Sequence, residues 1–362
     1  GVNALLVSTT GHRNIAIGTQ ALTSNTTASN NTAVGYQALL LNTTGTNNVA
    51  VGALALDANT TANGNIAVGA SSLGSNTTGA SNIGIGHEAL GFNVTSNDNT
   101  AVGYAALWKN TAANNTAMGF GALQFNTTGT QNVAVGKGAL DANTTANYNT
   151  AVGNSALSTN ILGSRNTALG RDALYAVNPA SAVDMYNTAV GFGAGSVVTT
   201  GVQNTFVGSL CGDSTTVGNY NTALGHGSLG ANCNSNNTAV GYLAGASITG
   251  GFNTCLGQQA GVNLTSGTYN TYLGSEAGNG SGTTSGGSNV DVAYASLYSI
   301  SSGGGDAGTG MWTMFSNTTG AIPVASGASE IRYHTTDGHT LAIGQQATHQ
   351  NPLTSEHTAT GD

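Results

Sequence analysis

The sequence predicts an all-β parallel β-solenoid (β-roll), in which coils of about 17 residues stack on one another. Three observations predict this fold. The pentapeptide Asn-Thr-Ala-Val-Gly, seen in full at residues 31–35, occurs sixteen times with small variations between residues 14 and 274. Counted along the sequence, the interval between successive copies is 16 or 17, with one exception of 21. Each position of the repeat keeps its residue type, which is typical of coils that complete one another's cores.

Asparagine stands four positions before every glycine of the repeat. If the coils stack at the ~4.8 Å strand spacing, these amides lie above one another and can bond side chain to side chain, as in fibrillar zippers. We therefore predict a structural asparagine ladder made of Asn14, Asn31, Asn48, Asn65, Asn82, Asn99, Asn115, Asn132, Asn149, Asn166, Asn187, Asn204, Asn221, Asn237, Asn253 and Asn270.

The strand offers two apolar columns. The position before each glycine holds a large apolar residue, such as Val34 or Met118, and the position before that is usually alanine, such as Ala33. Neighbouring residues of a strand point to opposite faces. We expect the valine column to point inward and the alanine column to face a close neighbour, most simply another copy of the chain. This predicts a homo-oligomer, specifically a homotrimer; the alternative is that alanine lies at a partly exposed site.

The rest of each coil is also patterned. Two variable residues and an Ala-Leu pair follow the glycine, but from Gly195 onward glycine mostly replaces the leucine, which predicts a narrower or differently packed cross-section. The connecting segments read Asn-Thr-Thr-Gly or Asn-Thr-Thr-Ala, and Asn and Gly suit the left-handed backbone of tight corners. These segments are also glycosylation sequons, so glycosylation stays open.

The organisation of the chain follows from where the repeat starts and stops. We predict a capping segment over 1–13, a solenoid of sixteen coils over 14–278, a Gly/Ser-rich linker over 279–288 and a small β-rich C-terminal tip domain over 289–362. The coil between Gly170 and Gly191 carries four extra residues. Insertions in solenoids form surface bulges, often on the binding side.

Repeats of the form Asn-Thr-Ala-Val-Gly-x-x-Ala-Leu, which cover about residues 12–278, resemble the left-handed β-roll heads of trimeric autotransporter adhesins and the related shafts of bacteriophage tail-fibre proteins. The resemblance implies a trimer of parallel β-rolls on a cell or virion surface. The departures are a coil longer than is usual in the adhesins, and the lack of a recognisable membrane anchor or self-cleaving chaperone.

Composition limits the partners. Charged residues make up 6% of the chain, with six Lys plus Arg against fourteen Asp plus Glu. Phosphate binding needs clustered Lys and Arg, so we expect no nucleic-acid partner. The sequence has no apolar run long enough to span a bilayer, so we expect no membrane insertion.

Aromatic residues on a regular scaffold are suited to contacts with sugars or proteins. Several follow a glycine of the repeat directly, and the bulkiest apolar cluster lies near residue 312. They could contact a cell-surface glycan or protein receptor, or the other subunits of an oligomer. The candidate contact residues are Tyr36, Tyr104, Phe120, Phe192, Tyr242 and Trp312.

No motif for catalysis or metal binding stands out. Cys211, Cys233 and Cys255 are interpreted as small buried fillers, with a disulfide as the alternative. The late histidines, His334, His339, His349 and His357, lack close ligand spacing. Because no acid pair has a spacing that favours glycoside cleavage, we expect no catalytic residue, no enzyme activity, no metal and no cofactor.

These observations favour an extracellular structural fibre shaft, on a cell or virion surface, with an adhesive or receptor-contacting tip. One alternative is the subunit of an extracellular filament that grows by end-to-end stacking. Another is an ice-binding solenoid, suggested by a threonine column that includes Thr32 and Thr100 but is interrupted by residues such as Ile15 and Val49.

Overall fold

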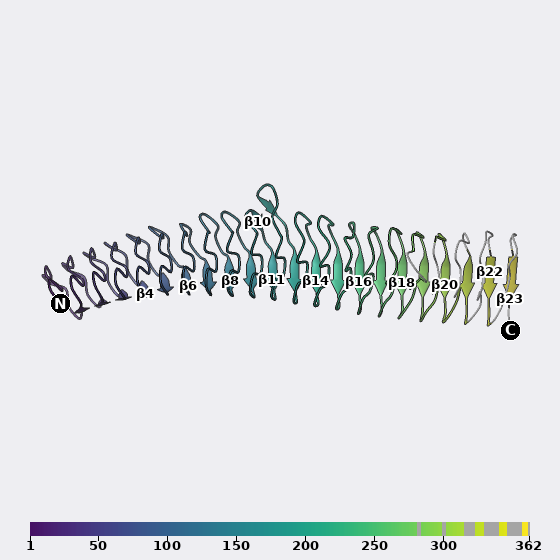
Figure 1. Ribbon diagram of the computed structural model, residues 1–362, viewed down its shortest axis with the longest axis horizontal. Coiled ribbons are helices and arrows are strands. Elements are labelled where there is room, and N and C mark those ends of the chain that lie inside the picture. Colours follow the sequence, from purple (N-terminus) through teal and green to yellow (C-terminus); the bar gives the residue numbers. More distant parts are fainter. Residues whose placement is uncertain (281–283, 299–301, 315–322, 329–339, 346–356, 361–362) are drawn as a thin grey trace. The chain divides into compact units, whose positions relative to one another are not determined.

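A computed structural model describes residues 1–280, 284–298, 302–314, 323–328, 340–345 and 357–360. The chain forms two compact units, Gly1–Met185 and Tyr186–Asp362. Both are parallel β-solenoids, and the described residues contain strands and turns but no helix. Figure 1 shows the short strands of each unit lying side by side.

The strands of the first unit are short because only the Thr-Ala-Val part of each repeat is extended. They are β1 (Ile15–Ile17), β2 (Thr32–Val34), β3 (Val49–Val51), β4 (Ile66–Val68), β5 (Ile83–Ile85), β6 (Thr100–Val102), β7 (Thr116–Met118), β8 (Val133–Val135), β9 (Thr150–Val152), β10 (Gly163–Ser164), β11 (Thr167–Leu169) and β12 (Val183–Asp184).

The second unit repeats this arrangement. Its described strands are β13 (Thr188–Val190), β14 (Thr205–Val207), β15 (Thr222–Leu224), β16 (Thr238–Val240), β17 (Thr254–Leu256), β18 (Thr271–Leu273), β19 (Val290–Val292), β20 (Ala307–Thr309), β21 (Val324–Ser326), β22 (Thr340–Ile343) and β23 (His357–Thr360).

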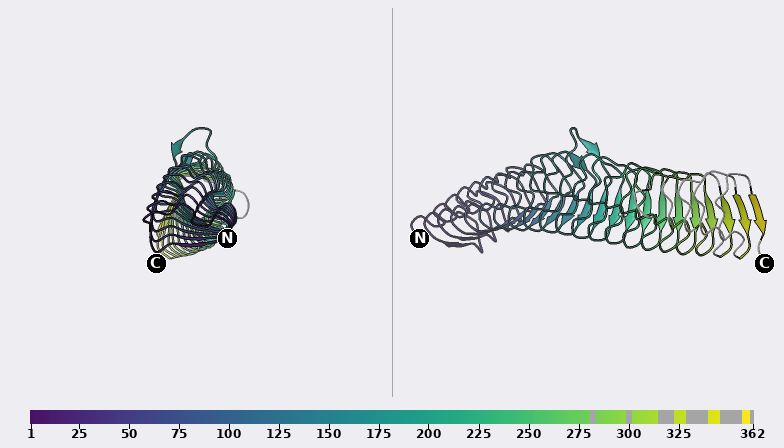
Figure 2. Two further views of the ribbon diagram at one scale, coloured as in Figure 1. Left: turned by 90° about the vertical axis from the view of Figure 1, so that its left-hand side faces the viewer. Right: turned by 45° about the vertical axis from the view of Figure 1, so that its right-hand side comes forward.

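Equivalent positions of successive coils pair in parallel register. Ala16 pairs with Ala33, and Ala33 pairs with Ala50, so the register repeats once per copy of the pentapeptide. The same register links β13 to β14 through Thr188 and Thr205. Figure 2 shows how each strand is followed by a loop that returns the chain to the next strand. The predicted fold class and coil length are thus confirmed.

The prediction that the valine column points inward is wrong. Ala33 and its equivalents in later coils, such as Ala50 and Ala101, are fully buried, whereas Ile17 is 59% exposed and Met118 is 47% exposed. The reason is the narrow interior of the coil. The leucine of each Ala-Leu pair, such as Leu39, already fills it at 0% exposure, and close packing leaves room only for a methyl group opposite.

Two consecutive residues, Ala38 and Leu39, both point inward because the backbone does not alternate there. Leu39 has a φ of 51°, in the left-handed region, which breaks the period of two that an extended strand imposes. A non-glycine residue in this conformation costs about 1–2 kcal/mol. Burial of the leucine side chain, at about 1.5–3 kcal/mol, offsets that cost.

The asparagine ladder is buried and joins each coil to the next. The side-chain oxygen of Asn48 accepts a hydrogen bond from the backbone N–H of Asn65 at 2.9 Å, and the Asn48 amide donates to the Ala62 carbonyl at 2.8 Å. Direct amide-to-amide bonds occur at some rungs, such as Asn99 to Asn82 at 3.2 Å. The ladder asparagines therefore hydrogen-bond mainly to backbone N–H and carbonyl groups rather than to one another's side chains.

A second ladder uses the asparagines of the Asn-Thr-Thr segments. Asn59 donates from its amide to the Asn42 side-chain oxygen at 2.8 Å, and both residues are fully buried. The left-handed corner expected at these asparagines lies elsewhere, at residues such as Asn30 and Asn47. Because Asn25, Asn42, Asn76, Asn126 and Asn143 are all 0% exposed, their side chains are closed to glycosylation in the folded chain.

The glycine of each repeat is required by backbone geometry and by contact with the next coil. Gly35 has a φ of 138°, which an L side chain rarely adopts. A Cβ at this position would lie 2.4 Å from the Gly52 carbonyl oxygen. Glycine therefore lets successive coils approach at strand spacing.

In the second unit the core changes its composition. Gly212 takes the place of the leucine with a φ of 60°, and a Cβ there would meet the Phe206 ring at 2.5 Å. Val198 and Ile248, both fully buried, stand where the first unit has the second asparagine ladder. The predicted change in packing is thus a change in which positions fill the core: glycine replaces the leucine, and larger apolar side chains at neighbouring positions occupy its volume.

The segments outside 14–278 also take part in coils. In the capping segment, the Leu5 N–H donates to the Ala21 carbonyl and the Gln20 N–H donates to the Val2 carbonyl. In the linker, Thr284 bridges to Leu264. In the segment expected to form a tip domain, β19 pairs with β18 in parallel register and the described strands continue to β23. The described part of 279–362 therefore extends the solenoid.

The insertion between Gly170 and Gly191 forms the predicted bulge. Its strand β12 pairs with β10 outside the main ladder, and Figure 1 shows the loop standing out beside β10. Arg165 holds the loop through a 2.9 Å ion pair with Asp184, with both side chains about half exposed. Exposed pairs of this kind contribute little stability.

Candidate functional site

The outward face of the strands in the first unit exposes many aliphatic side chains. The residues before and after the alanine column point outward. Those on this face include Ile15 (52% exposed), Ile17 (59%), Val51 (36%), Ile66 (36%), Ile85 (39%), Met118 (47%), Val133 (37%) and Leu169 (45%). Parallel register stacks these side chains in two columns. Extended apolar surfaces of this kind mark interaction sites.

A first aromatic column lies beside this face, at the position after each glycine. The His87, Tyr104 and Phe120 rings stack in successive coils, with centroids 5.4 Å and 5.0 Å apart and ring planes within 9°. The candidate contact residues in this column, Tyr36, Tyr104, Phe120, Phe192 and Tyr242, are 48–55% exposed. Within the first unit the structure thus brings Tyr104 and Phe120 together and leaves Tyr36 apart.

Trp312 belongs to a different column, one position further along the coil. It is 42% exposed, and its ring centroid lies 6.4 Å from that of Tyr294. The sequence gives little sign of this pair, because Ala293 stands in the glycine position before Tyr294 and Asp306 stands in the asparagine position of the coil that contains Trp312.

A second aromatic column was not expected from the sequence. Tyr148, Tyr186, Tyr220, Phe252 and Tyr269 each precede a ladder asparagine, have positive φ and are 48–60% exposed. Phe252 and Tyr269 stack at 5.0 Å, and Arg165 lies 4.7 Å from the Tyr148 ring centroid. The available signal was their fixed position directly before asparagine.

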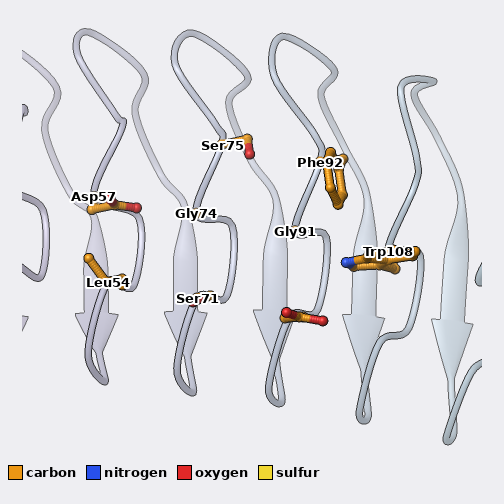
Figure 3. A pocket seen from close by; sticks show the side chains of 9 residues that line it. Leu54, Asp57, Ser71, Gly74, Ser75, Gly91, Phe92 and Trp108 are labelled. Atoms are coloured by element: carbon orange, nitrogen blue, oxygen red, sulfur yellow. The ribbon is translucent and has the colours of Figure 1, made fainter.

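A pocket opens in the first unit between coils that contain Asp57 and Trp108. Its volume is about 220 Å³, and its floor includes Gly74 and Gly91. Figure 3 shows the Asp57 side chain and the Trp108 indole on opposite sides of these glycines. Burial raises the pKa of the Asp57 carboxyl above its ordinary value. A second pocket, of about 340 Å³, is lined by Phe252 and Tyr269 in the second unit.

The chain matches no protein-family model, no curated protein and no solved structure. Its function must therefore be inferred from the surfaces themselves.

The residues expected to be chemically inert lie inside the coils. Cys211, Cys233 and Cys255 are buried free thiols, and burial raises the pKa of Cys211 to about 11 and that of Cys255 to about 12. His334, His339 and His349 lie outside the described residues, and no metal-binding cluster occurs among the residues that are described. Within that same part of the chain, no helix is long and apolar enough to cross a membrane.

The second unit buries several ionisable side chains in its core, among them Tyr272, Asp291 and Asp306. Asp291 occupies the column that alanine fills elsewhere and is 0% exposed. Burial raises the pKa of its carboxyl from 3.8 to about 7. The buried hydroxyls of Ser296 and Thr313 share a hydrogen bond nearby. The signal in the sequence was Asn289, which keeps the asparagine position of the repeat and thereby places Asp291 in the alanine column.

Proposed function

We propose that this chain is a structural shaft of an extracellular fibre, on a cell or virion surface, whose subunits associate side by side as a homotrimer. The observation that supports it best is the outward strand face, where aliphatic side chains up to 59% exposed repeat in register along the first unit. The alanines are buried inside their own coil, so they give no reason to expect a neighbouring subunit. The exposed valine column provides that reason instead.

Association of three copies of the chain would bury this outward strand face. A stable interface buries about 800 Å² on each partner. One column of aliphatic side chains, together with a second column of aliphatic residues and threonines, can supply this area along many coils. Few charges oppose the contact, since only 6% of residues are charged. The resemblance to adhesin heads and tail-fibre shafts also favours three-fold association. Such a shaft needs no catalytic residue or cofactor, and its exposed aromatic columns would contact a glycan or protein receptor.

Sedimentation of the full chain tests the proposal. We expect the 35.6 kDa chain to sediment as a trimer and the double variant Met118→Lys, Leu169→Lys to sediment as a monomer. Both side chains are nearly half exposed, so the fold should survive, and burying unpaired ammonium groups in the interface would be costly. Circular dichroism checks that the variant is folded.

The matched control is Thr19→Lys, because Thr19 is exposed and lies beside the strand face rather than on it. This variant should remain trimeric. A wild-type chain that sediments as a monomer at micromolar concentration would rule out the proposal. Open-ended fibres in negative-stain images would instead favour end-to-end stacking.

Ice binding is a second candidate, favoured by one observation in the second unit. Thr188, Thr205, Thr222, Thr238, Thr254 and Thr271 form an uninterrupted outward column in register. The adjacent outward column holds valine and leucine, so the hydroxyls form a single row. Thermal hysteresis of a freezing solution of the chain, and its loss in Thr222→Lys, would support this function.

A further inference from the structure

The pocket between Asp57 and Trp108 arises from a local change in one column of the repeat. The fifth position after the glycine holds Asp57, Gly74, Gly91 and Trp108 in four successive coils. A Cβ at Gly74 would lie 3.5 Å from a carboxylate oxygen of Asp57, and a Cβ at Gly91 would lie 3.1 Å from the Trp108 ring. The two glycines thus leave a gap, with a carboxylate at one end and an indole at the other.

A closely similar block of the chain shows what normally fills this gap. Asp141 stands in the same column within the same local sequence, Leu-Asp-Ala-Asn. In the next coil, the Ser158 hydroxyl donates a hydrogen bond to the Asp141 carboxylate at 2.8 Å. Gly74 replaces that serine beside Asp57 and removes the donor. The Asp57 carboxylate therefore borders open space where its counterpart has a hydroxyl partner.

The groups around the gap favour a ligand with several hydroxyls. Asp57 and Glu88 provide carboxylate oxygens, which accept hydrogen bonds, and the indole nitrogen of Trp108 faces the gap from the other side (Figure 3). This N–H is a donor only. A sugar hydroxyl can donate to a carboxylate and accept from an indole N–H.

The aromatic geometry argues against a cationic ligand. The Lys109 ammonium already lies 5.4 Å from the Trp108 ring centroid, over a face of the indole. The edge of the ring, which is approached closely from Gly91, is the positively polarised part of an aromatic system. Phe92 packs against Trp108 edge to face at 5.0 Å and adds apolar surface for the C–H groups of a sugar ring.

We propose that this pocket binds one monosaccharide unit of a surface glycan. Its volume of about 220 Å³ lies below the range of about 300–1,000 Å³ for drug-sized ligands, so it suits a single ring. The inference rests on the proposed function only in naming a glycan as the receptor. It does not require self-association, so sedimentation and sugar binding can fail independently.

Saturation-transfer NMR on the full chain tests the pocket, with the methyl glycosides of glucose, galactose, mannose and N-acetylglucosamine as separate probes. We expect transfer to at least one glycoside. Binding should weaken at least 10-fold in Trp108→Leu and in Gly74→Gln. Gly74→Gln fills the gap with a glutamine, which the same column of the repeat already contains at Gln124, so the repeat accommodates it.

Asp141→Ala is the matched control, since it removes the same carboxylate from a coil without a gap, and binding should be unchanged. Three results would overturn the proposal. They are no transfer to any of the four glycosides, equal transfer in Gly74→Gln, and binding of choline chloride that Gly74→Gln abolishes while the glycosides stay unbound.

Discussion

At the scale of single residues, backbone conformation explains which positions of the repeat are fixed. Glycine occupies a position with a large positive φ in coil after coil, such as Gly103 at 136° and Gly191 at 138°. Ala293 takes this place in the coil that contains β19, with a φ of 142°. This conformation is nearly exclusive to glycine and costs other residues about 1–3 kcal/mol. Ala293 is thus a strained residue.

Replacing it by glycine should relieve the strain. We expect Ala293→Gly to raise the free energy of unfolding of the second unit by about 1–2 kcal/mol, since the greater entropy of glycine in the unfolded chain offsets part of the gain. Urea unfolding followed by circular dichroism measures the change. The control is Ala325→Gly, at a buried strand position, which should lower stability. A lower urea midpoint for Ala293→Gly would contradict this interpretation.

The buried carboxyl of Asp291 makes the stability of the second unit depend on pH. Its pKa is raised from 3.8 to about 7 because the core penalises the charged form. The folded state therefore holds its proton more tightly than the unfolded state. This contribution to stability is fully present below about pH 4 and is lost as pH rises to about 7.

We expect the second unit to lose up to about 4 kcal/mol of stability between pH 4 and pH 8 from this group. Asp291→Asn has the same shape and does not ionise, so its urea midpoint should vary less with pH. The measurement is urea unfolding of both proteins at pH 4, 6 and 8. Parallel pH profiles would show that Asp291 does not carry the effect.

At the scale of the repeating element, the two asparagine ladders have different strengths. Asn65 accepts from the Asn82 backbone N–H at 2.9 Å and donates to the Gly79 carbonyl at 2.8 Å. Asn93 donates to the Asn76 side chain at 3.1 Å, but its own side-chain oxygen is buried without a hydrogen-bond partner. The amides of both ladders donate to backbone carbonyls, as Asn93 does to Ser96, but the oxygen of Asn65 also accepts from a backbone N–H. In the second unit, apolar residues such as Val198 stand at positions of the second ladder.

These differences predict unequal costs for the same substitution. Asn65→Val should cost about 3 kcal/mol, because it leaves the buried N–H of Asn82 without its partner. Asn93→Val should cost about 1 kcal/mol, because it removes an incomplete set of bonds and leaves no backbone donor unpaired. Thermal unfolding of the two variants compares them directly. Equal costs would show that the ladders are equivalent.

The coils beyond residue 278 could have been predicted in part from the sequence. Gly310, Gly327 and Gly344 recur at the same interval as the glycines of the earlier coils, and all have positive φ. They mark the coils of β20, β21 and β22, where the asparagine column is lost but the alanine column continues at Ala325 and Ala342. The glycine period persists because only glycine permits the close approach of neighbouring backbones. A glycine-only search would have predicted these coils.

At the scale of the whole molecule, low charge and exposed aliphatic columns determine how the chain would interact. With fourteen acidic and six basic residues in the whole chain, long-range attraction to a charged partner is weak. Apolar burial is then the main source of association energy, at about 25 cal/mol per Å². This is why the proposed trimer depends on the strand face, while the proposed sugar site depends on a few hydrogen-bonding groups.

The sequence by itself determined the fold class, the coil length and the positions of the first asparagine ladder, because a strict period restricts the chain to one stacking register. It did not determine which strand face points inward. That depends on the volume left inside the coil once a leucine in the left-handed conformation, such as Leu39, has filled it. The pocket at Asp57 also needed the tertiary structure, since its walls come from four different coils, from Asp57 to Trp108. Only the stacking of coils brings such residues together.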